Sequence, residues 1–446
     1  MRDNLDRFIR AAGAWVPDAT AMAILLIVGL GLAALAAGNS LLDTSDAFYR
    51  GLWMLLAFTM QMVLMLVLAS IVGGSLLFRR AVGRLAGLPR SIAQVFAGAV
   101  LLGAALSYLH WALSIALSPL VAVTFARAAE ERGLRVDFPC LLATVYASGS
   151  IWQYGFSSTP ALLVATPGHF LEAQTGVMPL ASTIWSPAAL AFVVAFPLLL
   201  ILVARLVMPR EVAPLSSFPD AQRLAQPPDA LPHDGVQGAV NWSERSRVLP
   251  LLLAAVLLGW LLHHFVVKRA SLDLNSVVAI LLFCAVVMQP HIAALSAALR
   301  ASIGVTWQVV VLYQLYGGVA GLLQYTSLGA DIAQFFASFA TPLTFPLLTA
   351  IAGTVIAVLV PSSGGQWIIQ GFITSETAAA VGVAPQLGLL ALGIGDQMGN
   401  LLSPFWMVLV AGIARVSFRS IYGYGLLFAA LWFSLGVAAF TLLPVT

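Results

Sequence analysis

Long stretches without a single Asp, Glu, Lys or Arg dominate the sequence. Each is longer than the ~18–20 apolar residues that cross a bilayer as a helix. The runs are 19–42, 51–78, 91–126, 138–171, 173–204, 274–299 and 301–330. Charged residues make up 9% of the chain, whereas a soluble domain carries about 25%. The sequence therefore predicts an all-α polytopic membrane protein that sits in a lipid bilayer.

The same composition excludes several classes of function. Cys140 and Cys284, the two cysteines, can form neither a disulfide framework nor a cysteine metal site. Because the sequence has no Walker glycine loop, ATP-driven transport by this chain alone is not indicated. The net charge of +3 comes from loops and indicates membrane orientation, not a nucleic-acid partner. A cleaved signal peptide is not expected, since acidic residues lie among the first arginines and a run of spanning length follows.

Basic residues predict how the spans are oriented. Three arginines in the first ten residues favour a cytoplasmic N-terminus by the positive-inside rule. The segment 39–50, with two aspartates and one arginine, suits an outer loop. In the resulting topology Arg50, Lys268 and Arg269 lie outside, the other basic residues lie inside, and the C-terminus is outside.

Two runs predict re-entrant helical hairpins. Residues 91–126 have arginines on both sides and polar residues in the middle, so both ends favour the cytoplasm. Two complete short spans are an alternative with the same topology. No basic residue occurs between Arg300 and Arg415, which favours a second hairpin entering from outside over residues 331–376.

The halves then follow one pattern in opposite orientations, as in the inverted repeats of secondary transporters. About nine transmembrane helices and two re-entrant hairpins are expected. The first repeat, 1–208, has spans 19–38 and 52–77, hairpin 91–126, broken span 138–167 and span 183–207. Residues 209–247, which are rich in proline, form a cytoplasmic linker. The second repeat, 248–446, has spans 248–267, 275–289 and 304–325, hairpin 331–376, broken span 385–410 and span 421–443.

The tip of the second hairpin is a candidate substrate site. Glycines let the backbone approach a ligand, serines offer hydroxyls, and a helix that starts there directs free N–H groups at an anion. A glycine-rich loop between two spans is the alternative. The candidate residues are Ser362, Ser363, Gly364, Gly365, Gln366 and Trp367.

The first half has a matching polar segment inside a crossing. Its hydroxyls and glycines suggest an unwound helix lining a cavity, although close helix packing through small residues would explain some of them. The candidates are Ser150, Trp152, Gln153, Ser157, Ser158 and Thr159. At the first hairpin tip, His110 either relays protons, donates to a carboxylate or packs as an ordinary core histidine, and Trp111 follows it.

Asp396 is the candidate ion-coupling residue. A carboxylate at mid-membrane costs about 2.5–3.5 kcal/mol, and no predicted span core holds Lys or Arg to pair with it. Either a proton or a Na⁺ also held by backbone carbonyls and Asn400 would neutralise it, and no other metal is assigned. A position near the outer surface is the alternative. Without an intramembrane cation, one substrate carboxylate is favoured over two or three, with Trp111, Trp152, Trp367 and Trp406 available to an apolar tail.

These segments resemble the bacterial short-chain fatty acid transporter family, of the acetoacetate and butyrate type, within the ion-transporter superfamily. The resemblance runs along almost the whole chain, and Val360-Pro361-Ser362-Ser363-Gly364-Gly365-Gln366-Trp367 is its most specific motif. Family members have a glycine run at Gln153-Tyr154, asparagine at His110, histidine at Gln366 and glutamate at Asp396, so the departures fall on the candidate site.

The resemblance implies symport of short-chain monocarboxylates such as butyrate or acetoacetate, coupled to H⁺ or Na⁺, by a homodimer in the bacterial cytoplasmic membrane. No cofactor other than the coupling ion is implied. A symporter for another organic anion, of the dicarboxylate type, is an alternative. An intramembrane acyl-transfer enzyme using His110 and Asp396 is a third, but no paired nucleophile and base support it.

Overall fold

The fold is all-helical throughout the part of the chain that the structure, a computed structural model, describes. The described residues are 19–222, 224, 244–303, 306–359, 363–402 and 404–443. Six helices in these ranges are long and apolar enough to cross a membrane: Leu41–Gly74, Ile92–Leu109, Leu113–Glu130, Pro187–Val207, Val248–Val267 and Phe418–Leu442. The expected class, an all-α polytopic membrane protein, is therefore confirmed.

In the first half, one short helix separates the early spans from a helical hairpin and a broken helix. The elements are α2 (Ala19–Ala36), α3 (Leu41–Met54), α4 (Leu56–Gly74), α5 (Leu76–Ala86), α6 (Ile92–Leu109), α7 (Trp111–Glu130), α8 (Phe138–Ser148), the 3₁₀ helix η1 (Gly149–Tyr154), α9 (Thr159–Ala165), α10 (Glu172–Thr175), η2 (Leu180–Ser182) and α11 (Pro187–Val207). Two short turns of helix follow, η3 (Leu215–Ser217) and α12 (Pro219–Gln222).

The second half ends on the same order of elements. It contains α14 (Val248–Leu262), continued by a π-helical turn η5 (His263–Val267), α15 (Leu274–Met288), α16 (Ile292–Ile303), α17 (Trp307–Tyr325), α18 (Leu328–Ala337), α19 (Phe345–Leu359), α20 (Ser363–Ala380), α21 (Pro385–Leu402), α22 (Pro404–Ile413) and α23 (Phe418–Leu442). From α4 and from α17 onward, each half runs through a short helix, a helical hairpin, two further helices (α8 and α9, or α21 and α22) and a final span. The inverted-repeat relation remains a prediction that this shared order supports.

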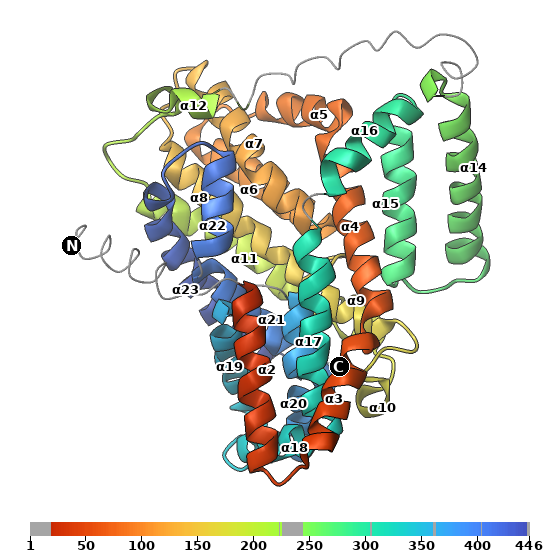
Figure 1. The fold of residues 1–446 in the computed structure, drawn as a ribbon. Coiled ribbons are helices and arrows are strands. Elements are labelled where there is room, and N and C mark those ends of the chain that lie inside the picture. The colour runs from red at the N-terminus through yellow and green to blue at the C-terminus, as the bar shows by residue number, and fades with distance from the viewer. Residues whose placement is uncertain are drawn as a thin grey trace.

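The two helical hairpins occupy opposite ends of the molecule (Figure 1). α6 and α7 lie in the upper half of the view, next to α5, whereas α19 and α20 lie in the lower half, next to α18. The broken helices α8–η1–α9 and α21–α22 run between them. Because α20 contacts α9 and α21 contacts η1, the interrupted helix of the first half meets α20 and α21 of the second half in the interior.

Local chemistry determines where several of these elements begin. Asp137 caps α8 by accepting from the Cys140 N–H at 2.9 Å, and its other oxygen accepts from Ala213 N at 3.0 Å. Asp273 and Ser276 form a reciprocal capping box at the start of α15. Such caps satisfy amide groups that the first helical turn leaves without partners.

Residues 39–50 differ from the expected outer loop, because residues 41–54 form α3. Ser40 caps this helix by accepting from Asp43 N at 3.1 Å, and Arg50 pairs with Asp46 one turn earlier at 2.7 Å. The small residues of α3 also let it approach α17 closely, since Gly51 lies against Gly317. The charges that suggested a loop are exposed on one face of an amphipathic helix.

The second hairpin is shorter than expected. Residues 328–337 form the separate amphipathic helix α18, so the hairpin arms are α19 and α20, over 345–380 rather than 331–376. The residues between the arms, 360–362, lie outside the described part of the chain, as do the first 18 residues and most of the expected linker at 209–247.

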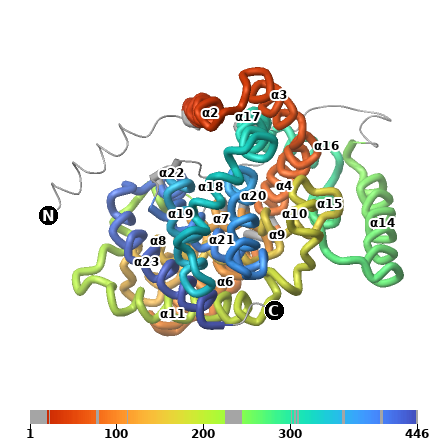
Figure 2. Tube along the Cα trace, turned by 90° about the horizontal axis from the view of Figure 1, so that it is seen from below, coloured from red at the N-terminus to blue at the C-terminus, as the bar shows by residue number. Residues whose placement is uncertain are grey.

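Helices at the periphery present apolar side chains outward. Figure 2 shows α14 at one edge, beside α15, and α2 and α3 at another edge, beside α17. On α14, Leu251, Leu252 and Val256 are exposed. An apolar outer face of this kind fits contact with lipid chains.

Candidate functional site

A buried hydrogen-bond network joins the two halves where the broken helices meet. Gln153, in η1 of the first half, donates through Nε2 to Asp396 Oδ2 in α21. The amide oxygen of Gln153 accepts from the hydroxyl of Ser363 at the start of α20, at 3.1 Å. One amide side chain therefore contacts both the hairpin arm α20 and the carboxylate of α21.

Asp396 is fully buried and lacks a positively charged partner among the described residues. Asn400 donates to Oδ2 at 3.2 Å, whereas Oδ1 accepts no hydrogen bond from any described group. The ion pairs found in the described ranges, Asp46–Arg50 and Arg127–Glu131, are exposed and lie elsewhere. Its negative charge is uncompensated in the structure, and its position at mid-membrane stays a prediction.

A glycine in α21 determines how closely the carboxylate approaches the second hairpin. A Cβ on Gly395 would lie 2.1 Å from the Ala350 carbonyl oxygen of α19, which no side chain can tolerate. The two helices are therefore in backbone contact at the residue before Asp396. This contact fixes where α21 packs along α19. It therefore also fixes the position of the Asp396 carboxylate.

Gln397 makes a second link between the halves. It accepts from the Trp152 indole N–H at 3.1 Å and donates to the Ser150 hydroxyl at 3.1 Å. Ser107 of α6 supports the same segment, because its hydroxyl accepts from Trp152 N at 3.0 Å and donates to the Gly149 carbonyl. Gln397 and Ser107 were not among the candidates, although Gln397 directly follows Asp396 and could have been included for that reason.

The first hairpin tip is attached to the unwound part of the broken helix. His110 is buried in extended conformation between α6 and α7, and Trp111 N donates to the Ser157 hydroxyl at 2.9 Å. Ser158 and Thr159, which follow, are buried. Thr159 lies against the start of the second hairpin arm, since a Cβ on Gly364 would lie 2.9 Å from its methyl group.

Three half-buried tryptophans lie next to the network. Trp111 has its ring centroid 6.3 Å from that of Trp152 and 6.1 Å from that of Trp406. The Trp406 indole N–H donates to Asn400 Oδ1 at 3.1 Å. The Trp152 indole thus bonds to Gln397, next to Asp396, and the Trp406 indole to Asn400, one helical turn later, while part of their apolar surface stays accessible.

The remaining candidates are placed differently. Gln366 donates to the Gly353 carbonyl at 2.8 Å and to Gln370 at 3.1 Å, so it faces α19 and not Gln153. Trp367 is fully buried beside Gly371 of its own helix, outside the tryptophan group. Gly365 lies in the first turn of α20. Ser362 lies outside the described residues.

The site consists of hydroxyls, amides and one carboxylate. Within the described ranges, no group of three His, Cys, Asp or Glu side chains could hold a metal ion. Amide and hydroxyl donors can hold a single carboxylate, and the first turn of α20 adds N–H groups at the positive end of a helix. A helical hairpin in each half and an interrupted helix that meet at buried polar groups are typical of membrane transporters.

Solved structures of transporters share this fold. MtrF of Neisseria gonorrhoeae, described as illuminating a class of antimetabolite efflux pumps, is 15% identical, with a TM-score of 0.60 over 98% of this chain and 97% of its own. The YdaH transporter of Alcanivorax borkumensis, described as having an unusual topology, is 16% identical, with a TM-score of 0.55 over 95% of this chain and 98% of its own. At these identities the likeness concerns the fold alone.

The chain belongs to the short-chain fatty acid transporter family, whose sequence model, described as "Short chain fatty acid transporter", matches residues 3–442. A protein of Escherichia coli K12 named "Putative short-chain fatty acid transporter" is 28% identical over 99% of this chain and all of its own length. A Haemophilus influenzae protein of the same name is 27% identical over 98% of this chain and 99% of its own. The expected family is therefore confirmed, and a transporter is favoured over an acyl-transfer enzyme.

Proposed function

We propose that this protein is a symporter that takes up a short-chain monocarboxylate, such as butyrate or acetoacetate, together with protons. The observation that carries the proposal is the fully buried carboxylate of Asp396, which has no cationic partner among the described residues and lies where both halves meet. Keeping such a carboxylate charged and unpaired is costly, so it takes up a cation.

Amide orientations favour a proton over Na⁺ as that cation. Both Gln153 and Asn400 turn their amide nitrogens toward Asp396, and their oxygens accept from Ser363 and from Trp406. Hard cations bind oxygen ligands, and here the side-chain oxygens are engaged elsewhere. A proton can bind Asp396 Oδ1, which accepts no hydrogen bond from the described residues, and needs no further oxygen ligand.

The same groups set the charge of the substrate. One proton on Asp396 removes one negative charge, and no other compensating cation lies in the described site. A single carboxylate can then bind the Ser363 hydroxyl and the α20 amide groups, whereas a dicarboxylate would bring an unpaired charge. A short alkyl tail can contact the accessible faces of Trp111, Trp152 and Trp406.

Uptake by proteoliposomes under imposed gradients tests the proposal. Wild-type protein should accumulate labelled butyrate and acetoacetate when the outside is acidic, and a dicarboxylate should not compete. Asp396→Asn, which keeps size but cannot exchange a proton, should lose accumulation against a gradient. Asp331→Asn is the matched control, because Asp331 is exposed on α18. Accumulation by Asp396→Asn at the wild-type level, or accumulation that follows only a Na⁺ gradient, would contradict the proposal.

A further inference from the structure

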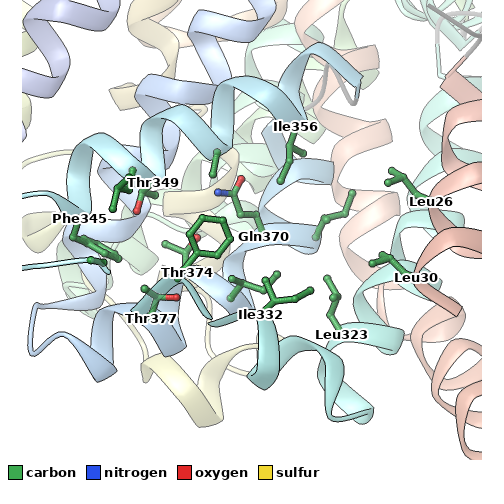
Figure 3. A pocket seen from close by; sticks show the side chains of 16 residues that line it. Leu26, Leu30, Leu323, Ile332, Phe345, Thr349, Ile356, Gln370, Thr374 and Thr377 are labelled. Atoms are coloured by element: carbon green, nitrogen blue, oxygen red, sulfur yellow. The ribbon is translucent and has the colours of Figure 1, made fainter. Parts of the chain in front are cut away.

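A cavity of about 260 Å³ lies on the far side of the second hairpin from the Asp396 network. Its walls come from α2 and α17 on one side and from α19 and α20 on the other, with α18 closing it below, as Figure 3 shows. None of the residues bonded to Asp396 lines it. For comparison, an apolar cavity of ~150 Å³ in a protein core binds benzene. This space is large enough for an alkyl chain.

The lining is apolar, with a small polar patch on one wall. Leu26, Leu30, Leu323, Ile332 and Ile356 face the space in Figure 3, and no charged side chain is among the described residues that line it. An ionised head group would be desolvated there without compensation. The occupant must therefore be uncharged.

Three polar groups of that wall lack hydrogen-bond partners. Gln370, Thr349 and Thr374 are each more than nine-tenths buried and line the cavity. Gln370 accepts from Gln366 through its amide oxygen, but its Nε2 donates to no described acceptor. The two threonine hydroxyls also bond to no described group. These three polar atoms border the cavity and are not among the fully enclosed unpaired atoms of the described residues, so an occupant with one hydrogen-bonding end can reach and pair with them.

We propose that this cavity is a second binding site, which takes a single alkyl chain carrying one uncharged hydrogen-bonding end. A medium-chain alcohol or the undissociated form of a medium-chain fatty acid has this chemistry. The chain lies among the leucine and isoleucine side chains, and the hydroxyl or carboxyl group binds Gln370 and the two threonines. The wall formed by α2 lies at the edge of the molecule (Figure 2), so we expect entry there from the lipid phase.

The occupant also contacts a residue that is bonded to the substrate-binding hairpin. Gln366, near the tip of that hairpin, donates to Gln370 at 3.1 Å. A ligand that accepts from Gln370 Nε2 would restrain the amide to which Gln366 donates, and should thereby slow uptake. That effect rests on the proposed function, whereas binding to the cavity does not.

Photolabelling of the purified, non-transporting protein tests the binding site. A diazirine-bearing octanol should label peptides of α19 and α20 in a saturable way, and unlabelled octanol should compete. Ala352→Phe, which fills the cavity, should reduce this labelling to background. Ile351→Phe is the matched control, because Ile351 is 46% exposed on the other face of α19. Labelling that does not saturate, or that is equal in the two variants, would overturn the proposal.

The head group is tested with two further comparisons. Octanesulfonate, which is charged at every working pH, should not compete with the photoreactive alcohol. Gln370→Leu should weaken competition by octanol about two- to tenfold, as expected for one lost hydrogen bond, without changing the melting temperature enough to indicate misfolding. Competition by octanesulfonate equal to that by octanol would overturn the uncharged site, whatever the outcome of the uptake assays.

Discussion

At the scale of single residues, Gln153 links the first half to both α20 and α21 of the second half. It donates to Asp396 of α21 and accepts from Ser363 of α20. Among the described side chains of the network, Gln153 is the one that bonds to both helices. Gln153→Leu keeps the size but removes one hydrogen bond from the buried carboxylate of Asp396 and the acceptor of the buried Ser363 hydroxyl. We expect a loss of about 1–3 kcal/mol in stability and a raised KM for butyrate. Thermal unfolding in detergent and uptake kinetics measure the two effects.

Gln334→Leu is the control for that variant, because Gln334 is exposed on α18. It should leave both stability and KM close to wild type. If Gln153→Leu behaved in the same way, the hydrogen bonds of Gln153 would have no role in binding the substrate.

Trp111 tests whether the tryptophan group selects chain length. Its ring lies between Trp152 and Trp406, so Trp111→Leu should open space for longer tails. We expect the ratio of inhibition by hexanoate to inhibition by acetate to rise about threefold or more, since one methylene group is worth ~1–3 kcal/mol in an apolar pocket. Trp53→Leu, at an exposed position of α3, is the control. An unchanged ratio with uniformly weaker uptake would mean that Trp111 has a packing role only.

The sequence identified many residues of the network but not the direction in which each side chain points. Ser150, Trp152, Gln153, Ser363, Asp396 and Asn400 were all candidates, because each is a polar or aromatic residue inside a predicted span or hairpin. Gln366 and Trp367 stand beside Ser363 in sequence but point elsewhere, since successive helical residues face directions about 100° apart. Which of them faces Gln153 depends on where α20 begins, and composition does not fix that residue.

At the scale of elements, the contact between α19 and α21 positions Asp396. Gly395→Ala would place a methyl group in the Ala350 carbonyl and force the helices apart. We expect a loss of about 1–3 kcal/mol in stability, as for other overpacked sites, and lower uptake because the carboxylate moves. Gly423→Ala is the control, because no atom lies within 4 Å of its added Cβ in α23. Equal melting temperatures of the two variants would show that α19 and α21 are not in this close contact.

Charge-free runs predicted most helices to within a few residues, because the bilayer imposes their length and apolarity. They failed where a helix is amphipathic. Residues 41–54 form α3 and residues 328–337 form α18, although both contain charged or polar residues that suggested a loop or a longer hairpin. Helices with one exposed polar face are recognised by periodicity and caps, and not by mean apolarity.

At the scale of the whole molecule, the arginine distribution predicts which ends face the cytoplasm. Single cysteines introduced after replacing Cys140 and Cys284 can test it with a reagent that does not cross membranes. Ser271→Cys, in the exposed segment after α14, should react in intact cells. Ser217→Cys, which is exposed between α11 and α14, should react only after the membrane is opened. The reverse pattern would mean that the protein is inserted in the opposite orientation.

The meeting of the two halves could not be derived from local sequence. Matching polar segments in both halves predicted a shared site, but the partners are far apart in the chain, as in the bond from Trp152 to Gln397. Nor does the sequence indicate the cavity beside the second hairpin. Its walls come from five helices, and none of the five has a local sequence pattern that marks a binding site.

Simultaneous recording of proton and butyrate entry into proteoliposomes tests the central claim most directly. With no gradient imposed other than that of butyrate, a pH-sensitive dye inside the vesicles should report acidification in step with uptake by wild-type protein. The membrane potential is clamped, and the rate of passive entry of butyric acid is measured in protein-free vesicles and subtracted. Asp396→Asn should show no carrier-dependent acidification, and Asp331→Asn should match wild type. Butyrate entry through the carrier without proton entry, or proton entry retained in Asp396→Asn, would contradict the account.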